Sequence, residues 1–162
     1  MRKGKSIMKR MKVTVLSLVA LMMLVLAGCG ASAKGIFGEH DFRNVNWQVD
    51  AAAVKDSEEA EPFLETENVI NYNEETFEGH DAVISYNFFD GKLRKGGAMI
   101  TAEDEEEANQ ILEEMKKILE KGYGKSTSTI GNTTVYETEK TVVELRATAN
   151  RVDIVFEDAQ MN

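Results

Sequence analysis

Alternation of apolar and polar residues dominates the middle and the end of the chain. Six stretches show it, at residues 68–74, 81–89, 92–101, 132–138, 143–147 and 152–156. Because successive side chains of a strand point to opposite faces of a sheet, this period of two predicts strands with one buried face. Asp90 and Gly91 follow the second stretch and are typical of a tight hairpin turn, and a second tight turn is expected at Ala149 and Asn150.

Two adjacent glycines, Gly96 and Gly97, lie inside the third of these stretches. A glycine has no side chain to pack, so it weakens the interior of a strand. It is found there where the strand has a β-bulge or where another part of the chain approaches the backbone closely. We expect one of these two features at this point of the sheet.

A long helix is predicted between the third and the fourth strand. Its apolar residues recur every three or four positions and form one stripe, consisting of Ala108, Ile111, Leu112, Met115, Ile118 and Leu119. Thr101 followed by Asp104 resembles a capping box, and the acids from Glu103 to Glu107 suit the positive end of the helix dipole. Gly122 is expected to be the residue just past the end of the helix.

A shorter helix is predicted earlier in the chain, from Ala51 to about Glu59, with Asp50 as its N-cap. Pro62 follows it and cannot continue a helix. The element order is therefore helix, three strands, helix, three strands, so the two halves resemble each other. This order predicts an α+β fold, an antiparallel sheet of about six strands with two α-helices packed on it.

A separate apolar segment lies at the N-terminus. The first twelve residues hold six basic side chains and no acid, and residues 13–28 are apolar or small except for Thr14 and Ser17. A basic stretch, a short apolar core and small residues are typical of a secretory signal, expected here as a helix. An uncleaved membrane anchor is the alternative, for which about 20 apolar residues are needed.

The only cysteine of the chain, Cys29, closes this apolar run. It follows Leu26, Ala27 and Gly28, and together these residues resemble the lipobox of bacterial lipoproteins. The resemblance implies cleavage before Cys29, lipidation of its thiol, and localisation on the extracytoplasmic face of a cell membrane. Two acyl chains on this cysteine would hold the protein there stably. A free or buried cysteine is the alternative interpretation.

These boundaries divide the chain into three parts. They are a signal peptide at residues 1–28, a lipidated cysteine with a flexible tether at residues 29–40, and a single α+β domain at residues 41–162. Cleavage leaves 134 of the 162 residues, enough for one domain with a modest core. Because no further cysteine is present, packing must stabilise that core without disulfides.

Charge limits the partners of the domain. Cleavage lowers the number of Lys and Arg residues from 19 to 13 against 28 acids, which gives a net charge of −15. Nucleic acid and anionic headgroups repel such a domain, so we expect no nucleic-acid partner and attachment to the membrane only through the lipid on Cys29. Solubility is a sufficient reason for the charge.

Motifs for catalysis or metal binding are missing from the sequence. It has no nucleophile elbow, no zinc-protease motif and no phosphate-binding or dinucleotide-binding glycine pattern. His40 and His80 each precede an aspartate, but neither pair has a third zinc ligand nearby in the sequence. We therefore expect no enzyme activity, no cofactor and no metal site, although a hydrolase assembled from scattered residues stays as a third possibility.

Part of the chain resembles small secreted domains of known type. The stretches DFRNVNW at residues 41–47 and YNFFDGKL at residues 86–93, with a helix opening at Asp50, are similar to the β-lactamase-inhibitor-like and BamE-like superfamily. The resemblance implies a helical segment packed on an antiparallel sheet, and binding of other proteins. Gln48 departs from the pattern, because a glycine is usual before the helix.

These observations favour a lipid-anchored, extracytoplasmic protein-binding module of the bacterial cell envelope. Most aromatic residues are expected in the core, whereas Phe89 beside the hairpin turn and Tyr123 between two glycines are candidate contacts for a protein partner. The alternative is a small-ligand or cation-binding lipoprotein associated with a transporter or sensor. That alternative predicts an enclosed pocket between the sheet and the helices.

Overall fold

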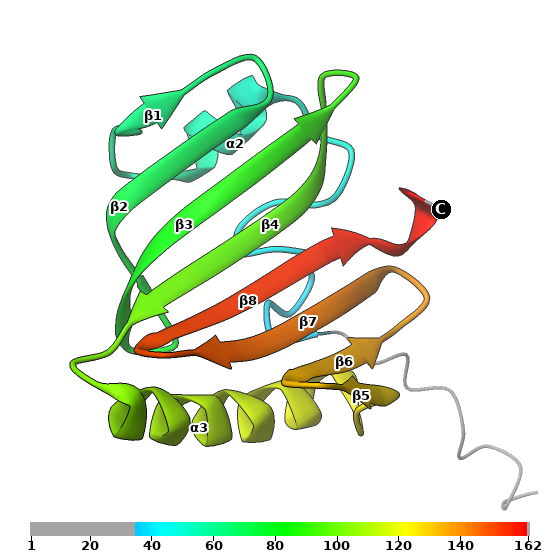
Figure 1. Cartoon of the computed structure of the whole chain (residues 1–162). Coiled ribbons are helices and arrows are strands. Elements are labelled where there is room, and N and C mark those ends of the chain that lie inside the picture. Colours follow the sequence, from blue (N-terminus) through cyan, green and yellow to red (C-terminus); the bar gives the residue numbers. More distant parts are fainter. Residues whose placement is uncertain (1–34, 162) are drawn as a thin grey trace, which may run out of the picture. The chain divides into compact units, whose positions relative to one another are not determined.

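An eight-stranded antiparallel sheet is the framework of the domain (Figure 1). The computed structural model describes residues 35–161, so the predicted signal helix lies outside the described residues. The strands are arranged in the order β1-β2-β3-β4-β8-β7-β6-β5, which places the β4–β8 pair at the centre. The predicted α+β class is confirmed, whereas the predicted number of six strands is wrong.

Each half of the domain is a helix followed by four strands. The first half consists of α2 (Ala51–Ser57), β1 (Leu64–Glu65), β2 (Val69–Phe77), β3 (His80–Phe89) and β4 (Lys92–Thr101). The second consists of α3 (Glu105–Tyr123), β5 (Ser128–Ile130), β6 (Thr133–Glu137), β7 (Thr141–Thr148) and β8 (Arg151–Asp158), before a short 3-10 turn, η1 (Ala159–Met161). Because β4 and β8 pair antiparallel and the strand order is mirrored about them, an approximate two-fold axis perpendicular to the sheet relates the two sets of strands.

The two strands that the sequence pattern missed, β1 and β5, form the edges of the sheet. Both are short, and all of their residues are exposed. A strand without a buried face shows no alternation of apolar and polar residues, so no local signal marks it. Pairing with β2 and β6 makes these segments strands.

The N-caps of the two helices are aspartates. Asp50 caps α2 as predicted, since its carboxylate accepts a hydrogen bond from the N–H of Ala53 at 3.0 Å. The N-cap of α3 is Asp104, whose carboxylate accepts from the N–H of Glu107 at 2.9 Å. The predicted capping role of Thr101 is wrong, because that residue is the last of β4.

Gly122 does not end α3 but allows the N-terminal segment to contact it. The helix continues to Tyr123, and Gly124, with a φ of 83°, is its C-cap. A side chain at Gly122 would overlap Ile36, and the N–H of Gly35 donates a hydrogen bond to the Gly122 carbonyl at 3.1 Å. The last residues of the predicted flexible tether therefore pack on the domain.

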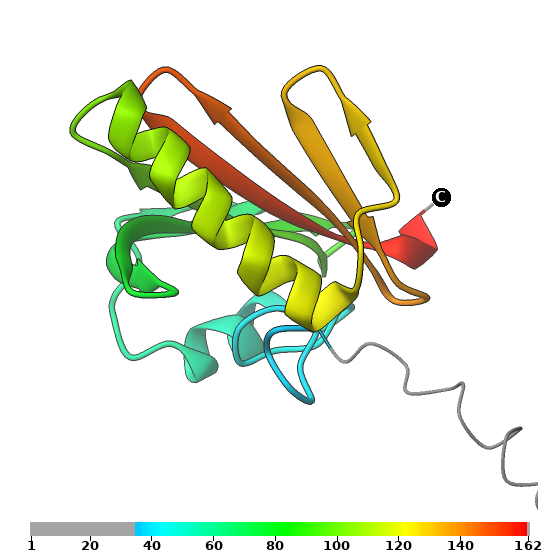
Figure 2. The ribbon, with the colours of Figure 1, turned by 90° about the horizontal axis from the view of Figure 1, so that it is seen from below.

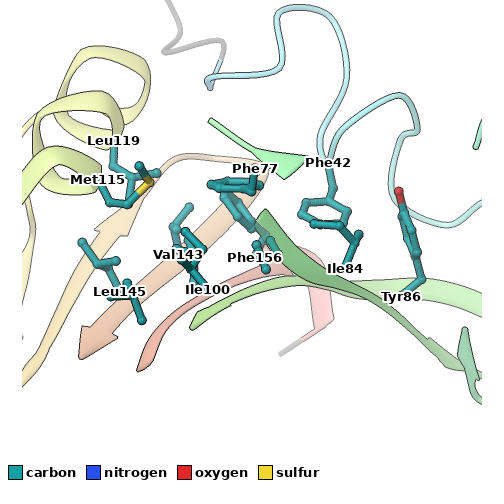
Figure 3. Close-up of a cluster of buried hydrophobic side chains, with 14 of the residues drawn as sticks. Phe42, Phe77, Ile84, Tyr86, Ile100, Met115, Leu119, Val143, Leu145 and Phe156 are labelled. Atoms are coloured by element: carbon teal, nitrogen blue, oxygen red, sulfur yellow. The ribbon is translucent and has the colours of Figure 1, made fainter. Parts of the chain in front are cut away.

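The hydrophobic core lies on one face of the sheet (Figure 3). Directly paired residues of neighbouring strands share a face, so the row Ala98, Ile154 and Leu145 faces the core as a unit. Helix α3 covers β6, β7 and β8 on this face. Val54 of α2 and Phe42 of the N-terminal segment are buried in the same core, and Figure 2 shows both segments beside the sheet.

Phe42 packs directly on the backbone of β4. Its ring centroid is 5.3 Å from that of Tyr86 and 5.2 Å from that of Phe156. A Cβ atom at Gly96 would overlap the Phe42 ring, whereas one at Gly97 would make an ordinary contact on the other face of the sheet. The close approach expected at the two glycines is confirmed, and Gly96 is the residue that permits it.

Gln48 has a φ of 69°, in the left-handed region that glycine favours. The backbone is held there because its N–H donates a hydrogen bond to the carbonyl of Leu93 at 2.9 Å. The next residue, Val49, accepts a hydrogen bond from the N–H of Leu93 at 2.8 Å. The backbone thus adopts a conformation that suits a glycine, although the residue is glutamine.

We expect Gly96→Ala to lower the free energy of unfolding by about 1–3 kcal/mol, because the new methyl group must displace the Phe42 ring. Gly97→Ala is the matched control. It lowers the conformational freedom of the unfolded chain in the same way, but its methyl group overlaps no other atom, so it should shift stability by no more than about 1 kcal/mol. Urea denaturation measures both variants. Equal destabilisation by the two substitutions would contradict the close approach at Gly96.

We expect Gln48→Gly to be more stable than Gln48→Ala by about 1 kcal/mol, because only glycine adopts a positive φ without steric cost. Both variants remove the glutamine side chain, so their difference reports the backbone conformation alone. Thermal unfolding followed by circular dichroism measures it. A glycine variant no more stable than the alanine variant would show that the backbone at this position is not left-handed.

Candidate functional site

The face of the sheet opposite the core, here called the open face, carries apolar side chains that no element of residues 35–161 covers. The helices and the N-terminal segment that the structure describes pack on the core face (Figure 2). The apolar residues of the open face are half-buried by their neighbours in the strands; they are Val69, Val83, Met99, Val135, Val142 and Val155. Such a surface is a candidate for contact with another molecule.

One row of directly paired residues crosses all the strands on the open face. It consists of Leu64, Asn71, Ser85, Gly97, Val155, Glu144, Val135 and Ser128. Ser85 and Gly97 lie at its centre, next to Val155. Because Ser85 and Gly97 are so small, the side chains of Val83, Met99 and Val155 border a low area near the middle of the open face.

Charged residues on the open face occur mainly in pairs. Arg146 and Arg151 both contact Asp153, at 3.3 Å and 3.1 Å between nitrogen and oxygen. Lys95 pairs with Glu157 on the neighbouring strand. Exposed pairs of this kind contribute at most about 1 kcal/mol each to stability.

Phe89 is exposed, as its predicted role requires, with 47% of its surface accessible. It ends β3 beside Asp90 and Gly91, whose φ values of 53° and 71° confirm the expected hairpin turn. Phe88 is buried in the core, so Phe89 points to the side of the open face. Contact between Phe89 and a partner stays a prediction.

Tyr123 is buried, with 6% of its surface accessible, so its predicted exposure is wrong. Its ring packs on Phe156, and a side chain at Gly35 would overlap its hydroxyl group. Burial raises the pKa of Tyr123 above its ordinary value. The glycines on either side of it serve the approach of the N-terminal segment and the end of α3, and they do not indicate an exposed loop.

The predicted lipidation site, Cys29, and the lipobox residues Leu26, Ala27 and Gly28 lie outside the described residues. Among residues 35–161, no helix has the length and the apolar character needed to cross a membrane.

A buried polar cluster that the sequence analysis missed joins the N-terminal segment to the sheet. Arg43 donates two hydrogen bonds of 2.9 Å to the carboxylate of Glu58, whose side chain is 2% exposed. It also donates to Glu75 at 2.8 Å and to the carbonyl of Thr76 at 3.0 Å. The hydroxyl group of Tyr86 donates to Glu58 as well.

The charges of this cluster stabilise one another. Burial opposes the charge of Arg43, but the hydrogen bond and the attraction of Glu58 outweigh it and raise the pKa of Arg43. Burial, followed by the hydrogen bond to Glu58, raises the pKa of Tyr86, and burial raises the pKa of Tyr72 to about 12. Both tyrosines therefore stay neutral. The partners of Arg43 lie far apart in the sequence, so no local pattern could have revealed them.

Neither histidine of the domain belongs to a metal site that the structure describes. His40 is exposed, and Nε2 of His80 lies 3.3 Å from the carboxylate of Glu114 on α3. Within residues 35–161, no three or more His, Cys, Asp and Glu side chains are grouped so as to hold a metal ion. Between the sheet and the helices, the described residues form one hydrophobic cluster that includes Phe42 and Phe156, and Phe37 packs against both rings.

Comparison with known proteins found no family model, no curated protein and no solved structure that matches this chain. Candidate functions therefore rest on the residues and the geometry described above.

We expect Arg43→Ala to lower the free energy of unfolding by about 3–5 kcal/mol, because it leaves the carboxylate of Glu58 buried and unpaired. Arg146→Ala removes a cation from an exposed pair and should cost no more than about 1 kcal/mol. Urea denaturation compares the two variants. Addition of Glu58→Gln to Arg43→Ala should recover part of the loss, and similar losses for both arginine variants would contradict this assignment.

Proposed function

We propose that this chain is a lipid-anchored, extracytoplasmic protein-binding module of the bacterial cell envelope that has no catalytic activity and binds its partner through the open face. The observation that carries the proposal is the asymmetry of the sheet. One face is buried under α2, α3 and the N-terminal segment, while the other carries a band of apolar residues with no covering layer in the described residues.

The character of the open face suits a protein partner. Protein interfaces combine an apolar centre with a polar rim. Val83, Met99 and Val155 lie near the centre of the open face, and the paired charges around Asp153 lie next to them. A small-ligand site would need an enclosed pocket, whereas the described side chains between the sheet and the helices form one buried hydrophobic cluster.

The position of the N-terminal segment is compatible with an anchor at Cys29. Gly35 contacts α3 on the core side of the sheet, and the chain from Cys29 to Gly35 spans at most about 20 Å when extended. A lipid on Cys29 would therefore hold the domain close to the membrane. Gly35 itself lies on the side opposite the open face, so the described part of the chain begins away from that face.

We expect chemical crosslinking in living cells to capture a discrete partner with the wild-type chain. The double variant Ser85→Arg/Val155→Arg should reduce capture at least tenfold, which corresponds to about 1.4 kcal/mol, because two long cations then project from the centre of the open face. Asn109→Arg on the exposed surface of α3 is the matched control. Mass spectrometry identifies the captured protein, and thermal unfolding confirms that the variants fold.

Cys29→Ser separates anchoring from binding in the same experiment. It should move the chain out of the membrane fraction and lower capture of a membrane-proximal partner. Capture that the open-face substitutions leave unchanged would contradict binding through this face. Confirmed lipidation with no captured partner at all would contradict the proposed function and favour the small-ligand alternative.

A further inference from the structure

One edge of the sheet, formed by β5, differs in composition from the rest of the chain. From Ser126 to Tyr136 no residue is charged, although 29% of all residues in the chain are. All residues of β5 are exposed, and it contains Ile130, which at 73% is the most exposed large apolar side chain in the described part of the chain. The strand order leaves one side of β5 without a partner strand among the described residues.

The opposite edge, formed by β1, is protected in the usual way. Natural proteins prevent edge strands from pairing with other chains by means of charged residues and prolines. Glu65 lies within β1, Glu67 follows it, and Pro62 precedes it. The β5 edge has neither a charge nor a proline, so its short length of three residues is the only such protection that it keeps.

We propose that β5 pairs antiparallel with β5 of a second copy of this chain, so that the two sheets join edge to edge. Pairing centred on Thr129 places Ser128 of each copy opposite Ile130 of the other. No like charges meet in this arrangement, because the strand is uncharged over its whole length. The two exposed isoleucines are partly covered by the neighbouring copy.

The geometry of this pairing is already used within the chain. Antiparallel strands are related by a two-fold axis perpendicular to the sheet, as β4 and β8 are here. A two-fold axis of the same kind at β5 would place the open faces of the two copies on the same side of the joined sheet. Gly35 of each copy then lies on the other side, because it contacts α3 on the core face. Two lipid anchors would thus reach the same membrane.

A second copy fits this edge better than an unrelated protein, and this step rests on the anchoring proposed above. Three paired residues form a weak contact, but two chains held in one membrane meet at a high effective concentration. With a net charge of −15, the two copies of the mature chain repel each other. An uncharged edge is the part of the surface at which that repulsion is smallest.

Disulfide crosslinking of the full-length chain in intact cells tests the pairing. Opposed residues of an antiparallel pair have Cα atoms about 4.5–5.5 Å apart, which a disulfide can span. Thr129→Cys should therefore give a covalent dimer under mild oxidation, at least tenfold more than Glu67→Cys at the protected β1 edge. The wild-type chain, whose only cysteine is Cys29, provides the background.

A second substitution tests whether the dimer depends on the edge itself. Ile130→Lys, added to Thr129→Cys, should reduce the dimer at least tenfold, because it places two like charges beside the axis. Ile130→Thr, added in the same way, should preserve it. Ile130 is largely exposed, so neither change should disturb folding, and circular dichroism verifies this.

Three results would overturn the pairing: no excess of dimer over Glu67→Cys, no effect of Ile130→Lys, or an adduct with a different protein at position 129. Fractionation of the same cells reports anchoring separately. A chain that is anchored but forms no dimer overturns the edge pairing and leaves the anchoring proposal intact. If the chain is not anchored, oxidation of the purified full-length Thr129→Cys chain decides the pairing by itself.

Discussion

The contact between Phe42 and the backbone at Gly96 is the constraint on which the rest of the domain depends. Helix α3 covers only the β6–β8 side of the core face, so the remaining strands need another cover. Phe42 supplies it by packing between Tyr86 and Phe156. Trp47 extends this cover across the sheet, because its indole N–H donates a hydrogen bond of 3.0 Å to the hydroxyl group of Thr141 in the buried core.

The Arg43 cluster explains how so short a helix as α2 is held in place. A helix of seven residues is not stable alone, and α2 buries only Val54. Glu58, directly after its last residue, binds Arg43 of the N-terminal segment, and Arg43 in turn binds Glu75 of β2. The cluster therefore fixes the segment that covers the core. The carboxylate of Glu58 is buried, and it accepts hydrogen bonds from both Arg43 and Tyr86, which suits a structural role.

Burial on one side only connects this fold with the proposed function. All described covering elements lie on the core face, so the open face keeps its apolar residues available. The two edges of the sheet also differ in how well they are protected from pairing with another chain. Acids protect β1 from other strands, whereas β5 has no charge and leaves its exposed isoleucine at the surface. A single sheet thus offers one face for a partner and one edge for a second copy.

The sequence by itself determined the elements whose signals are local. The alternation in β3 and β4, the turn at Asp90 and Gly91, the exposure of Phe89 beside it, and the apolar stripe of α3 each depend on residues a few positions apart. The lipobox before Cys29 is equally local, and its function stays a prediction. Only the tertiary structure decided that β1 and β5 are strands, that Tyr123 is buried and that Arg43 binds Glu58 and Glu75. Each of these depends on contacts with residues distant in the sequence, and such contacts leave no periodic pattern in the chain.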